Sequence, residues 1–306
     1  MSEANFRIPI VVINLDADAQ RMEFMAAQLT RLNLAFERFS AVAGTTLPES
    51  VRGYFPREED GSGFLSRGEI GCYASHLAVY QKIADGRIAA PALVLEDDVE
   101  LPEDLGLLLN KIVNALPRDW DMVRLSSTAK RAYFEHAPLA DGRRLVRYSV
   151  SPGSNGAMLV SRRGAQKFLK PSPRRLPVDQ DNRRLWAFDL NLFGVVPPPV
   201  RGNALATSSI DDLASGARRE NRERQRHLRH ERRLTKRHAW NMQKFGCAGW
   251  AAAEFVTALS WLHRRRARPL YLARMSAWLA SVAAARKRQP VTHSVAIGET
   301  AETRPS

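Results

Sequence analysis

The sequence predicts an α/β protein with a mostly parallel sheet, flanking helices and a basic helical C-terminal extension. Residues 8–15 are an apolar, β-branched run followed by a helical pattern and a short strand, which is a βαβ unit. Residues 91–99 are a second apolar run, which ends in three carboxylates. Residues 201–306 carry 21 Lys and Arg against 8 Asp and Glu, whereas residues 1–200 carry 25 against 24, so the excess positive charge lies in the last third.

The elements of the expected fold follow in order. The first strand gives way near Asp18 to a helix whose apolar residues recur at spacings of three to four. A strand at residues 35–39 completes the βαβ unit, and a loop rich in Gly, Pro and acidic residues follows at 44–63. A helix then carries Leu77, Tyr80 and Ile83 on one face. Further strands are expected at residues 93–95, 120–125, 145–150 and 156–160, the last two as paired strands or a hairpin, and further helices at residues 103–116, 163–169 and from 178 to 192.

Length and composition bound the class of protein. A chain of 306 residues with 44% hydrophobic content can bury one sizeable core, which we place at residues 1–206. A helical extension is expected at 207–288 and a disordered tail at 289–306. Cys72 and Cys247 are far apart, which argues against a disulfide or a thiolate metal site and favours a reducing compartment. Neither a signal peptide nor a membrane-spanning run is expected.

The acidic triplet Glu96, Asp97 and Asp98 is the sharpest chemical signal. A buried strand delivers it to its own carboxyl end, which is where ligands bind in open α/β sheets. Neighbouring carboxylates repel one another unless a cation lies between them, and hard oxygen ligands suit Mg²⁺ or Mn²⁺. The alternative is a strand followed by a solvated acidic turn.

The basic extension contains two amphipathic segments bracketed by arginines. The first holds Trp250, Phe255 and Trp261, and the second holds Tyr271 and Trp278. Aromatic and aliphatic residues on one face with Arg at the ends are typical of a helix that lies on an anionic membrane surface. A helical hairpin packed on the main domain explains the same pattern equally well.

Three stretches occur together and in order: residues 13–16 with Arg21, residues 68–72 with Ser75 and His76, and residues 95–98. Jointly they make residues 8–200 resemble glycosyltransferase family 25, which includes bacterial lipooligosaccharide galactosyltransferases and the collagen galactosyltransferase domains. The resemblance implies a GT-A-like, Rossmann-type fold and a UDP-sugar donor, usually UDP-galactose. It also implies a divalent metal, Mn²⁺ or Mg²⁺, and inversion at the anomeric carbon.

The resemblance assigns roles to the matching positions. Asp98 is expected to bind the metal directly, and Glu96 and Asp97 to contact metal-bound water or the ribose, so that Glu96 and Asp98 form the metal site. The residues expected around the donor nucleotide are Asn14, Asp16, Arg21, Glu69, Ser75, His76 and Asp97. Strand-end and helix-cap roles also suit Asn14 and Asp16, and a buried core position also suits His76.

A carboxylate base should take the proton of the acceptor hydroxyl. Asp179 matches the family's late Pro-Val-Asp segment and is the first choice, with Asp181 second and Asp189 third. Asp179 is equally suited to cap the following helix. In the first motif Met22 and Glu23 follow Arg21, where the family usually carries further basic residues.

The resemblance implies a metal-dependent inverting glycosyltransferase, and the basic amphipathic extension would hold it at the cytoplasmic, inner face of the plasma membrane. It would move a hexose, expected to be galactose, from a UDP-sugar to a lipooligosaccharide or lipopolysaccharide-type glycan. Its partners would be the UDP-hexose, the glycan or glycolipid acceptor and an anionic membrane surface, with no nucleic acid. The alternatives are a catalytically inactive scaffold for glycan assembly and a basic nucleic-acid-binding protein.

Overall fold

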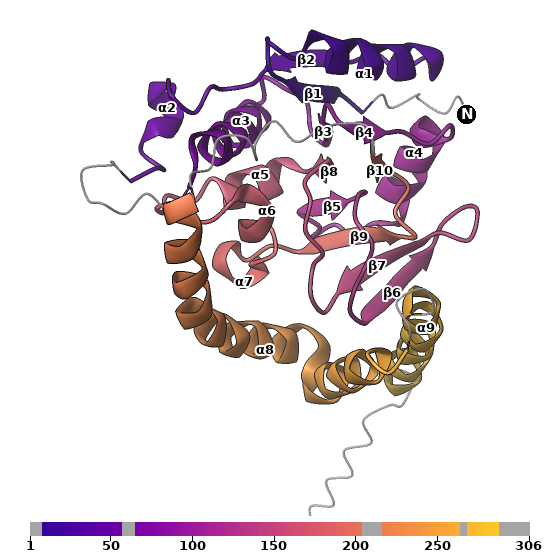
Figure 1. Cartoon of the computed structure of the whole chain (residues 1–306). Helices are drawn as coiled ribbons and strands as arrows, with labels where there is room; N and C mark the ends of the chain where they lie inside the picture. Colours follow the sequence, from indigo (N-terminus) through magenta and orange to yellow (C-terminus); the bar gives the residue numbers. More distant parts are fainter. Residues whose placement is uncertain (1–7, 57–64, 204–215, 264–267, 288–306) are drawn as a thin grey trace, which may run out of the picture.

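The computed structural model describes residues 8–56, 65–203, 216–263 and 268–287, with an eight-stranded sheet at its centre (Figure 1). The strand order is β2-β1-β3-β8-β5-β9-β7-β6. These strands are β1 (Ile10–Asn14), β2 (Glu37–Ser40), β3 (Ala92–Glu96), β5 (Met122–Arg124), β6 (Tyr133–Pro138), β7 (Arg144–Tyr148), β8 (Ala157–Val160) and β9 (Leu192–Val196). Two further short strands, β4 (Val99–Glu100) and β10 (Arg201–Gly202), pair antiparallel beside it.

Six of the eight strands run in one direction, and only β8 and β7 run against them. This confirms the expected α/β class with its mostly parallel sheet. The expected pairing of the segments at 145–150 and 156–160 is wrong, because β7 pairs with β6 and β9 whereas β8 lies between β3 and β5. All four residues of β8 are buried, which a strand achieves at the sheet centre. Strand β6 was not expected, because polar Glu135 and His136 interrupt its apolar pattern.

Apart from α2, which lies within the loop expected at residues 44–63, the helices follow the expected order. They are α1 (Ala19–Arg31), α2 (Glu49–Arg52), α3 (Arg67–Ala84), α4 (Leu105–Ala115), α5 (Arg162–Phe168), α6 (Val178–Asp181), α7 (Leu185–Phe188), α8 (Gly216–Ser260) and α9 (Arg268–Lys287). The single helix expected from residue 178 to 192 is instead α6, α7 and the start of β9. Asp189 ends α7 in the left-handed conformation, with φ 49°, and an L-residue in that conformation cannot continue a right-handed helix.

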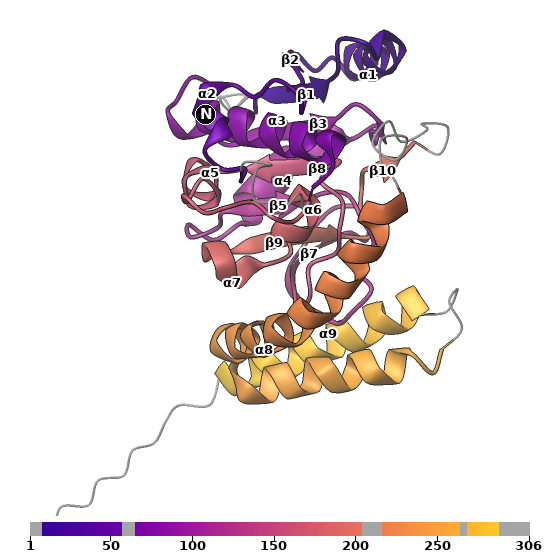
Figure 2. The ribbon, with the colours of Figure 1, turned by 60° about the vertical axis from the view of Figure 1, so that its left-hand side comes forward.

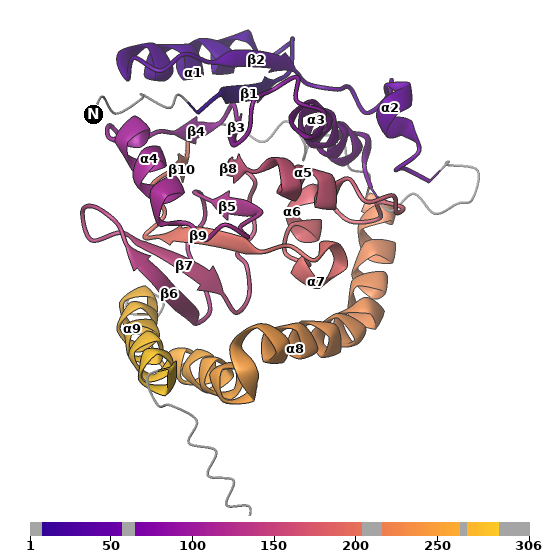
Figure 3. The ribbon, with the colours of Figure 1, turned by 180° about the vertical axis from the view of Figure 1, so that it is seen from behind.

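Helices cover both faces of the sheet, α3 and α5 on one and α1 and α4 on the other (Figures 1 and 3). In β1, Val11 and Ile13 enter the first core while Ile10 and Val12 enter the second, because successive strand side chains point to opposite faces. Burying one such side chain stabilises the fold by about 1.5–3 kcal/mol. Two-sided burial holds β1 and β3 side by side, so the polar residues that follow them reach the same edge.

The C-terminal helices α8 and α9 lie side by side and pack on strand β6 (Figures 1 and 2). The backbone N–H of Ala132 donates to Thr257 Oγ1 at 3.1 Å, and that of Tyr133 donates to Ser276 Oγ at 3.2 Å. Buried apolar residues complete this contact, namely Ala132, Ala253, Val256, Leu272 and Leu279. The extension was expected either to lie on a membrane surface or to pack on the main domain as a helical hairpin. The structure shows contact with the main domain.

Two expectations about the chain's organisation lie outside the described residues. The boundary after residue 206 falls within 204–215, and the tail at 289–306 falls within 288–306. Among the helices that the structure describes, none combines the length and the apolar character that a membrane crossing needs.

Candidate functional site

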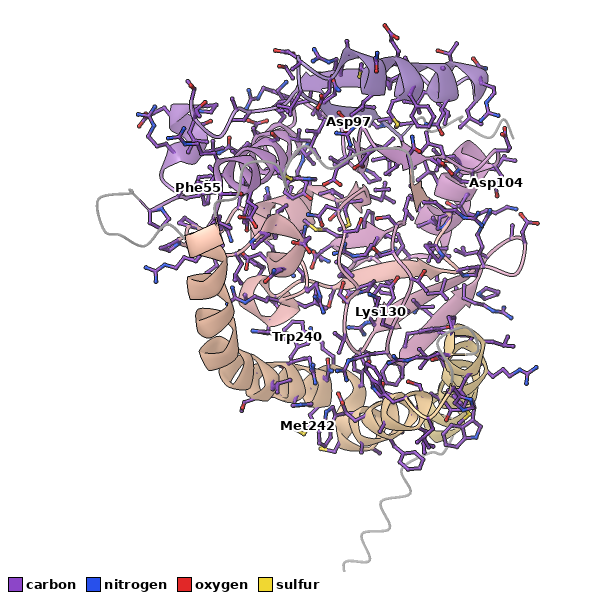
Figure 4. The ribbon with its side chains drawn as sticks, in the orientation of Figure 1. Phe55, Asp97, Asp104, Lys130, Trp240 and Met242 are labelled. Atoms are coloured by element: carbon purple, nitrogen blue, oxygen red, sulfur yellow. The ribbon has the colours of Figure 1, made fainter. Side chains whose placement is uncertain are left out.

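A cleft of about 430 Å³ lies at the carboxyl ends of β1 and β3. Ile13 pairs with Glu96 in these parallel neighbours, so the residues that follow each strand emerge together. The wall of the cleft draws on all three stretches that the sequence singled out, through Asn14, Arg21, Ser75, His76, Glu96, Asp97 and Asp98. Figure 4 labels Asp97 at this edge and Trp240 and Met242 on α8, at the opposite end of the molecule.

Asn14 connects the two strand ends. Its Nδ2 donates to Asp97 Oδ2 at 2.7 Å and to the Asp18 carbonyl at 3.0 Å, and its Oδ1 accepts from Arg38 Nε at 2.9 Å. Asn14 is 2% exposed, and an amide buried to that degree must satisfy both of its polar ends. The side chain therefore sets the position of Asp97 relative to β1.

Arg21, in the first turn of α1, faces the acidic triplet. Its Nη1 lies 3.1 Å from Asp97 Oδ1, and its Nη2 lies 3.0 Å from Asp98 Oδ2. Burial raises the pKa of both aspartates above the ordinary value, while the Arg21 charge acts in the opposite direction. The structure therefore brings Arg21, Asp97 and Asp98 together as one charged cluster.

Asp16 lies outside the wall of the cleft. Its carboxylate accepts hydrogen bonds from Arg38 and from Ser40 Oγ, the latter at 2.8 Å. These bonds hold the pKa of Asp16 below its ordinary value. Arg38, which sequence analysis did not identify, thus binds both Asn14 and Asp16 and ties β2 to the end of β1.

Helix α3 supplies the second wall. His76 is fully buried, and its Nε2 lies 3.2 Å from Glu96 Oε1 at the end of β3. Ser75 Oγ donates to the Gly71 carbonyl at 2.7 Å and accepts from the Val42 N–H at 2.8 Å. Ser75 therefore fastens the loop at 41–45, which lines the same cleft, to α3.

Close backbone contact between this loop and α3 depends on two glycines that sequence analysis did not identify as site residues. A Cβ at Gly71 would lie 2.6 Å from the Val42 carbonyl oxygen, and one at Gly44 would lie 1.8 Å from the Arg67 carbonyl oxygen. Only glycine fits at either position. The sequence signal was a glycine within an otherwise helical pattern, which often marks close approach of another backbone.

Glu69 has a structural position at the start of α3. Its carboxylate accepts from the Ser66 backbone N–H at 2.7 Å, while the Glu69 N–H donates to Ser66 Oγ at 3.3 Å. This reciprocal pair is a capping box that starts the helix. The lining of the cleft passes through the neighbouring Arg67, Gly68 and Gly71, and Arg67 adds a positive charge that sequence analysis did not select.

The donor atoms at the cleft floor suit a hard divalent cation. Glu96 and Asp98 are partly exposed, with 28% and 39% of the side chain accessible, and both border the cleft. Among the described residues, Cys72, His76 and Glu96 also lie within 4.8 Å of one another. Burial, and then negative charges led by Glu96, raise the pKa of Cys72 well above its ordinary value, so the thiol stays protonated. Carboxylate oxygens are therefore the better ligand set.

The first two of the three aspartates considered as bases differ in environment. Asp181 is 2% exposed, and its carboxylate accepts from Tyr73 Oη at 2.9 Å and pairs with Arg184 Nη1 at 2.8 Å. Burial raises the pKa of Asp179, while the charges of Arg124 and Arg183 act against the rise. A Cβ at Gly153 would lie 3.3 Å from Asp179 Oδ2, which places Asp179 beside the loop before β8. Neither aspartate is among the residues lining the cleft.

Comparison with known proteins matches the same part of the chain. A family model described as "Glycosyltransferase family 25 (LPS biosynthesis protein)" matches residues 7–181. Procollagen galactosyltransferase 1-B of Xenopus laevis is 30% identical over 185 residues, covering 56% of this chain and 30% of that protein. Human procollagen galactosyltransferase 2 is 28% identical over 185 residues, covering 56% of this chain and 29% of that protein.

A further relative, the mouse protein named "Inactive glycosyltransferase 25 family member 3", is 27% identical over 213 residues, covering 61% of this chain and 36% of that protein. The chain thus matches about a third of the length of these curated relatives. The residues that the family model matches include β1, β3, α3 and all three stretches that form the cleft. The chain belongs to glycosyltransferase family 25.

Proposed function

We propose that this protein is an inverting glycosyltransferase that moves a hexose from a UDP-sugar to a lipooligosaccharide or lipopolysaccharide-type glycan, and that this hexose is galactose. One observation carries the proposal. Asn14, Arg21, His76 and the triplet at residues 96–98 converge on a single cleft at the carboxyl ends of two parallel strands. In open α/β sheets this edge binds nucleotides.

The donor occupies the cleft between β1, β3 and α3. Arg21 and Arg67 border it and offer positive charge to a diphosphate, and the loop at 41–45 offers backbone groups to the base and ribose. A volume of about 430 Å³ lies within the range of small-molecule sites. Membership of the family, with galactosyltransferases among the relatives, supports galactose as the sugar.

Glu96 and Asp98 would hold a divalent cation, Mn²⁺ or Mg²⁺, which when bound neutralises charge on the departing diphosphate. The reaction itself is a single displacement. The acceptor oxygen bonds to the anomeric carbon while the bond from that carbon to the UDP oxygen breaks, and UDP leaves with the electron pair. Attack opposite the leaving group inverts the configuration at that carbon.

The acceptor proton passes to a carboxylate, and Asp179 is the group proposed for this role. A raised pKa suits a base because the product acid is then formed more readily near neutral pH. Asp181 was the second candidate, but its carboxylate already accepts from Tyr73 and pairs with Arg184. Proton transfer to Asp181 would break that buried ion pair, which is costly.

The proposed location is the inner face of the plasma membrane. Trp261, Leu262 and Leu270 are 63%, 82% and 59% exposed, and they lie at the turn between α8 and α9. The sequence between these helices is rich in arginine. Exposed apolar side chains with neighbouring positive charge suit an anionic leaflet, and a glycolipid acceptor would be anchored in the same membrane.

Release of UDP from a panel of UDP-hexoses tests the donor and the metal together. We expect release with UDP-galactose and Mn²⁺, loss of release with EDTA, and at least a hundredfold loss in Asp98→Asn. Asp141→Asn is the matched control, because Asp141 is 73% exposed in a distant turn and Asn tolerates its left-handed conformation. If no UDP-hexose is consumed by the folded protein in the presence of a lipooligosaccharide, the transferase proposal fails.

A glycan-assembly scaffold is the second candidate, because one relative is named inactive. A scaffold would bind UDP by calorimetry and yet release none from any UDP-hexose. The intact carboxylates at residues 96–98 support the transferase over the scaffold.

A further inference from the structure

A second cleft of about 350 Å³ adjoins the first, and Glu96 and Asp98 belong to the walls of both. The second cleft lies on the other side of these carboxylates, towards β8 and β10. Its remaining polar lining consists largely of hydroxyl groups, from Ser126, Ser127, Thr128 and Ser154. A group bound in it would therefore lie next to a donor bound in the first cleft.

The hydroxyls come from two loops that are bonded to one another. Ser126 Oγ and Ser154 Oγ lie 3.4 Å apart, and Ser127 Oγ donates to the Gly153 carbonyl. Ser154 Oγ also accepts from the Gly156 N–H at 3.2 Å. Because the loop after β5 and the loop before β8 brace each other, the hydroxyls hold a defined arrangement.

Two residues at this cleft have a strained backbone. Ser127 and Ser154 have φ values of 77° and 75°, in the left-handed region that favours glycine. A residue other than glycine in such a conformation is strained, and strain of this kind is often found at binding sites. Both positions carry a hydroxyl that braces the two loops and also lines the second cleft.

The opposite wall is apolar with a charged rim. Val99, Pro198 and Val200 line it, and Arg201 stands beside them in β10. The Asn203 N–H donates to the Asp98 carbonyl at 2.7 Å, so the segment that carries Arg201 is tied to the acidic triplet. A pyranose presents hydroxyls at its edge and C–H groups on its face, and this cleft offers a partner for each.

We infer that the second cleft is the acceptor subsite, which binds one pyranose ring of the acceptor glycan with its reacting hydroxyl on the side of Glu96 and Asp98, near the loop before β8 that Asp179 adjoins. The inference rests on the proposed function, since it presumes that the first cleft holds the donor. It adds the side from which the acceptor enters and the residues that hold it, Ser127 and Ser154.

Saturation-transfer NMR with methyl glycosides tests the subsite directly. The probes are the methyl glycosides of galactose, glucose and N-acetylglucosamine, each measured with and without UDP. We expect a signal from at least one glycoside that persists when UDP saturates the first cleft. Absence of any signal, or displacement of the signal by UDP, would overturn the assignment.

A double variant at the two strained serines tests which residues hold the sugar. Ser127→Gly with Ser154→Gly removes both hydroxyls and relieves the backbone, but it also removes the bonds that brace the two loops. Urea unfolding and UDP titration of the variant therefore check that the fold and the first cleft are kept. Each lost hydrogen bond should weaken glycoside binding roughly three- to tenfold, and the double variant should lose the signal. Asn33→Gly is the matched control, because Asn33 is an exposed left-handed residue after α1 and should keep the full signal.

Calorimetric titration with UDP separates the two proposals. Equal glycoside signals in the wild type and the double variant would overturn the subsite, whatever the result with UDP. A wild type that binds a glycoside through the serines but does not bind UDP would refute the donor assignment and leave the second cleft as a sugar site.

Discussion

Arg21 Nη2 lies 3.0 Å from Asp98 Oδ2, which links the first turn of α1 to the residue proposed to bind the metal. The same guanidinium holds Asp97 through its other terminal nitrogen at 3.1 Å. Arg21 therefore places a positive charge beside both carboxylates before any metal ion or donor binds. A bound cation and the diphosphate of a donor would share this cluster, so Arg21 connects donor binding to the acidic triplet.

The pH dependence of UDP release should show an acidic limb governed by Asp97 and Asp98. Burial raises the pKa of both groups, and a protonated carboxylate binds a cation poorly, so activity should fall as the pH drops through their titration. Arg21→Gln removes the charge that lowers both pKa values, so the limb should move to higher pH. Initial rates of UDP release across a pH series, at one fixed Mn²⁺ concentration below saturation, measure the position of the limb. A limb that stays in place would show that these groups do not control it.

Gly71→Ala should destabilise the protein although alanine is the better helix former. The helix propensity favours alanine by about 1 kcal/mol, but the added Cβ would lie 2.6 Å from the Val42 carbonyl oxygen, and such overpacking costs roughly 1–3 kcal/mol. The loop at 41–45 must shift, so UDP binding should weaken as well. Gly53→Ala is the control, since no atom lies within 4 Å of its added Cβ. Urea unfolding and calorimetry compare the two variants, and equal stability would contradict the close contact.

Asp179→Asn should lower kcat for transfer by about 10²- to 10⁴-fold with little change in the donor KM, because a general base acts in the transition state. Asp189→Asn is the comparison variant. Asp189 is the third candidate base, and its side chain is 69% exposed, so its replacement should leave kcat unchanged if Asp179 is the base. Its left-handed conformation also accepts asparagine. Steady-state transfer kinetics on both variants decide between them. A larger loss in Asp189→Asn would move the assignment to that residue.

Replacing Trp261 and Leu262 with serine should weaken binding to anionic vesicles at least about tenfold, because burial of a large apolar side chain contributes about 1.5–3 kcal/mol. Leu107→Ser is the control, because Leu107 is 68% exposed on α4, outside the extension. Co-sedimentation of the full chain with anionic and neutral vesicles, at low and high salt, measures the effect. Parallel binding to duplex DNA tests the nucleic-acid alternative, and preference for DNA over vesicles would favour it.

Sequence pattern was enough to predict the α/β class, the order of most elements and the three stretches that meet at the cleft. These features follow from local pattern, because β1 and β3 are short apolar runs that end in polar residues, and parallel neighbours carry such residues to one edge. The capping box at Ser66 and Glu69 is equally local, although sequence analysis interpreted Glu69 as a ligand contact.

Which side chains face one another depends on the packing of distant segments. Arg38 reaches Asn14 from a strand 24 residues away, and Arg21 reaches Asp98, contacts that no spacing encodes because they depend on how β1, β2 and β3 align. The position of β8 between β3 and β5 likewise depends on burial of both its faces. That position brings Ser154 beside Ser126 and creates the second cleft. Long-range packing, which local periodicity does not record, therefore formed the proposed acceptor side of the site.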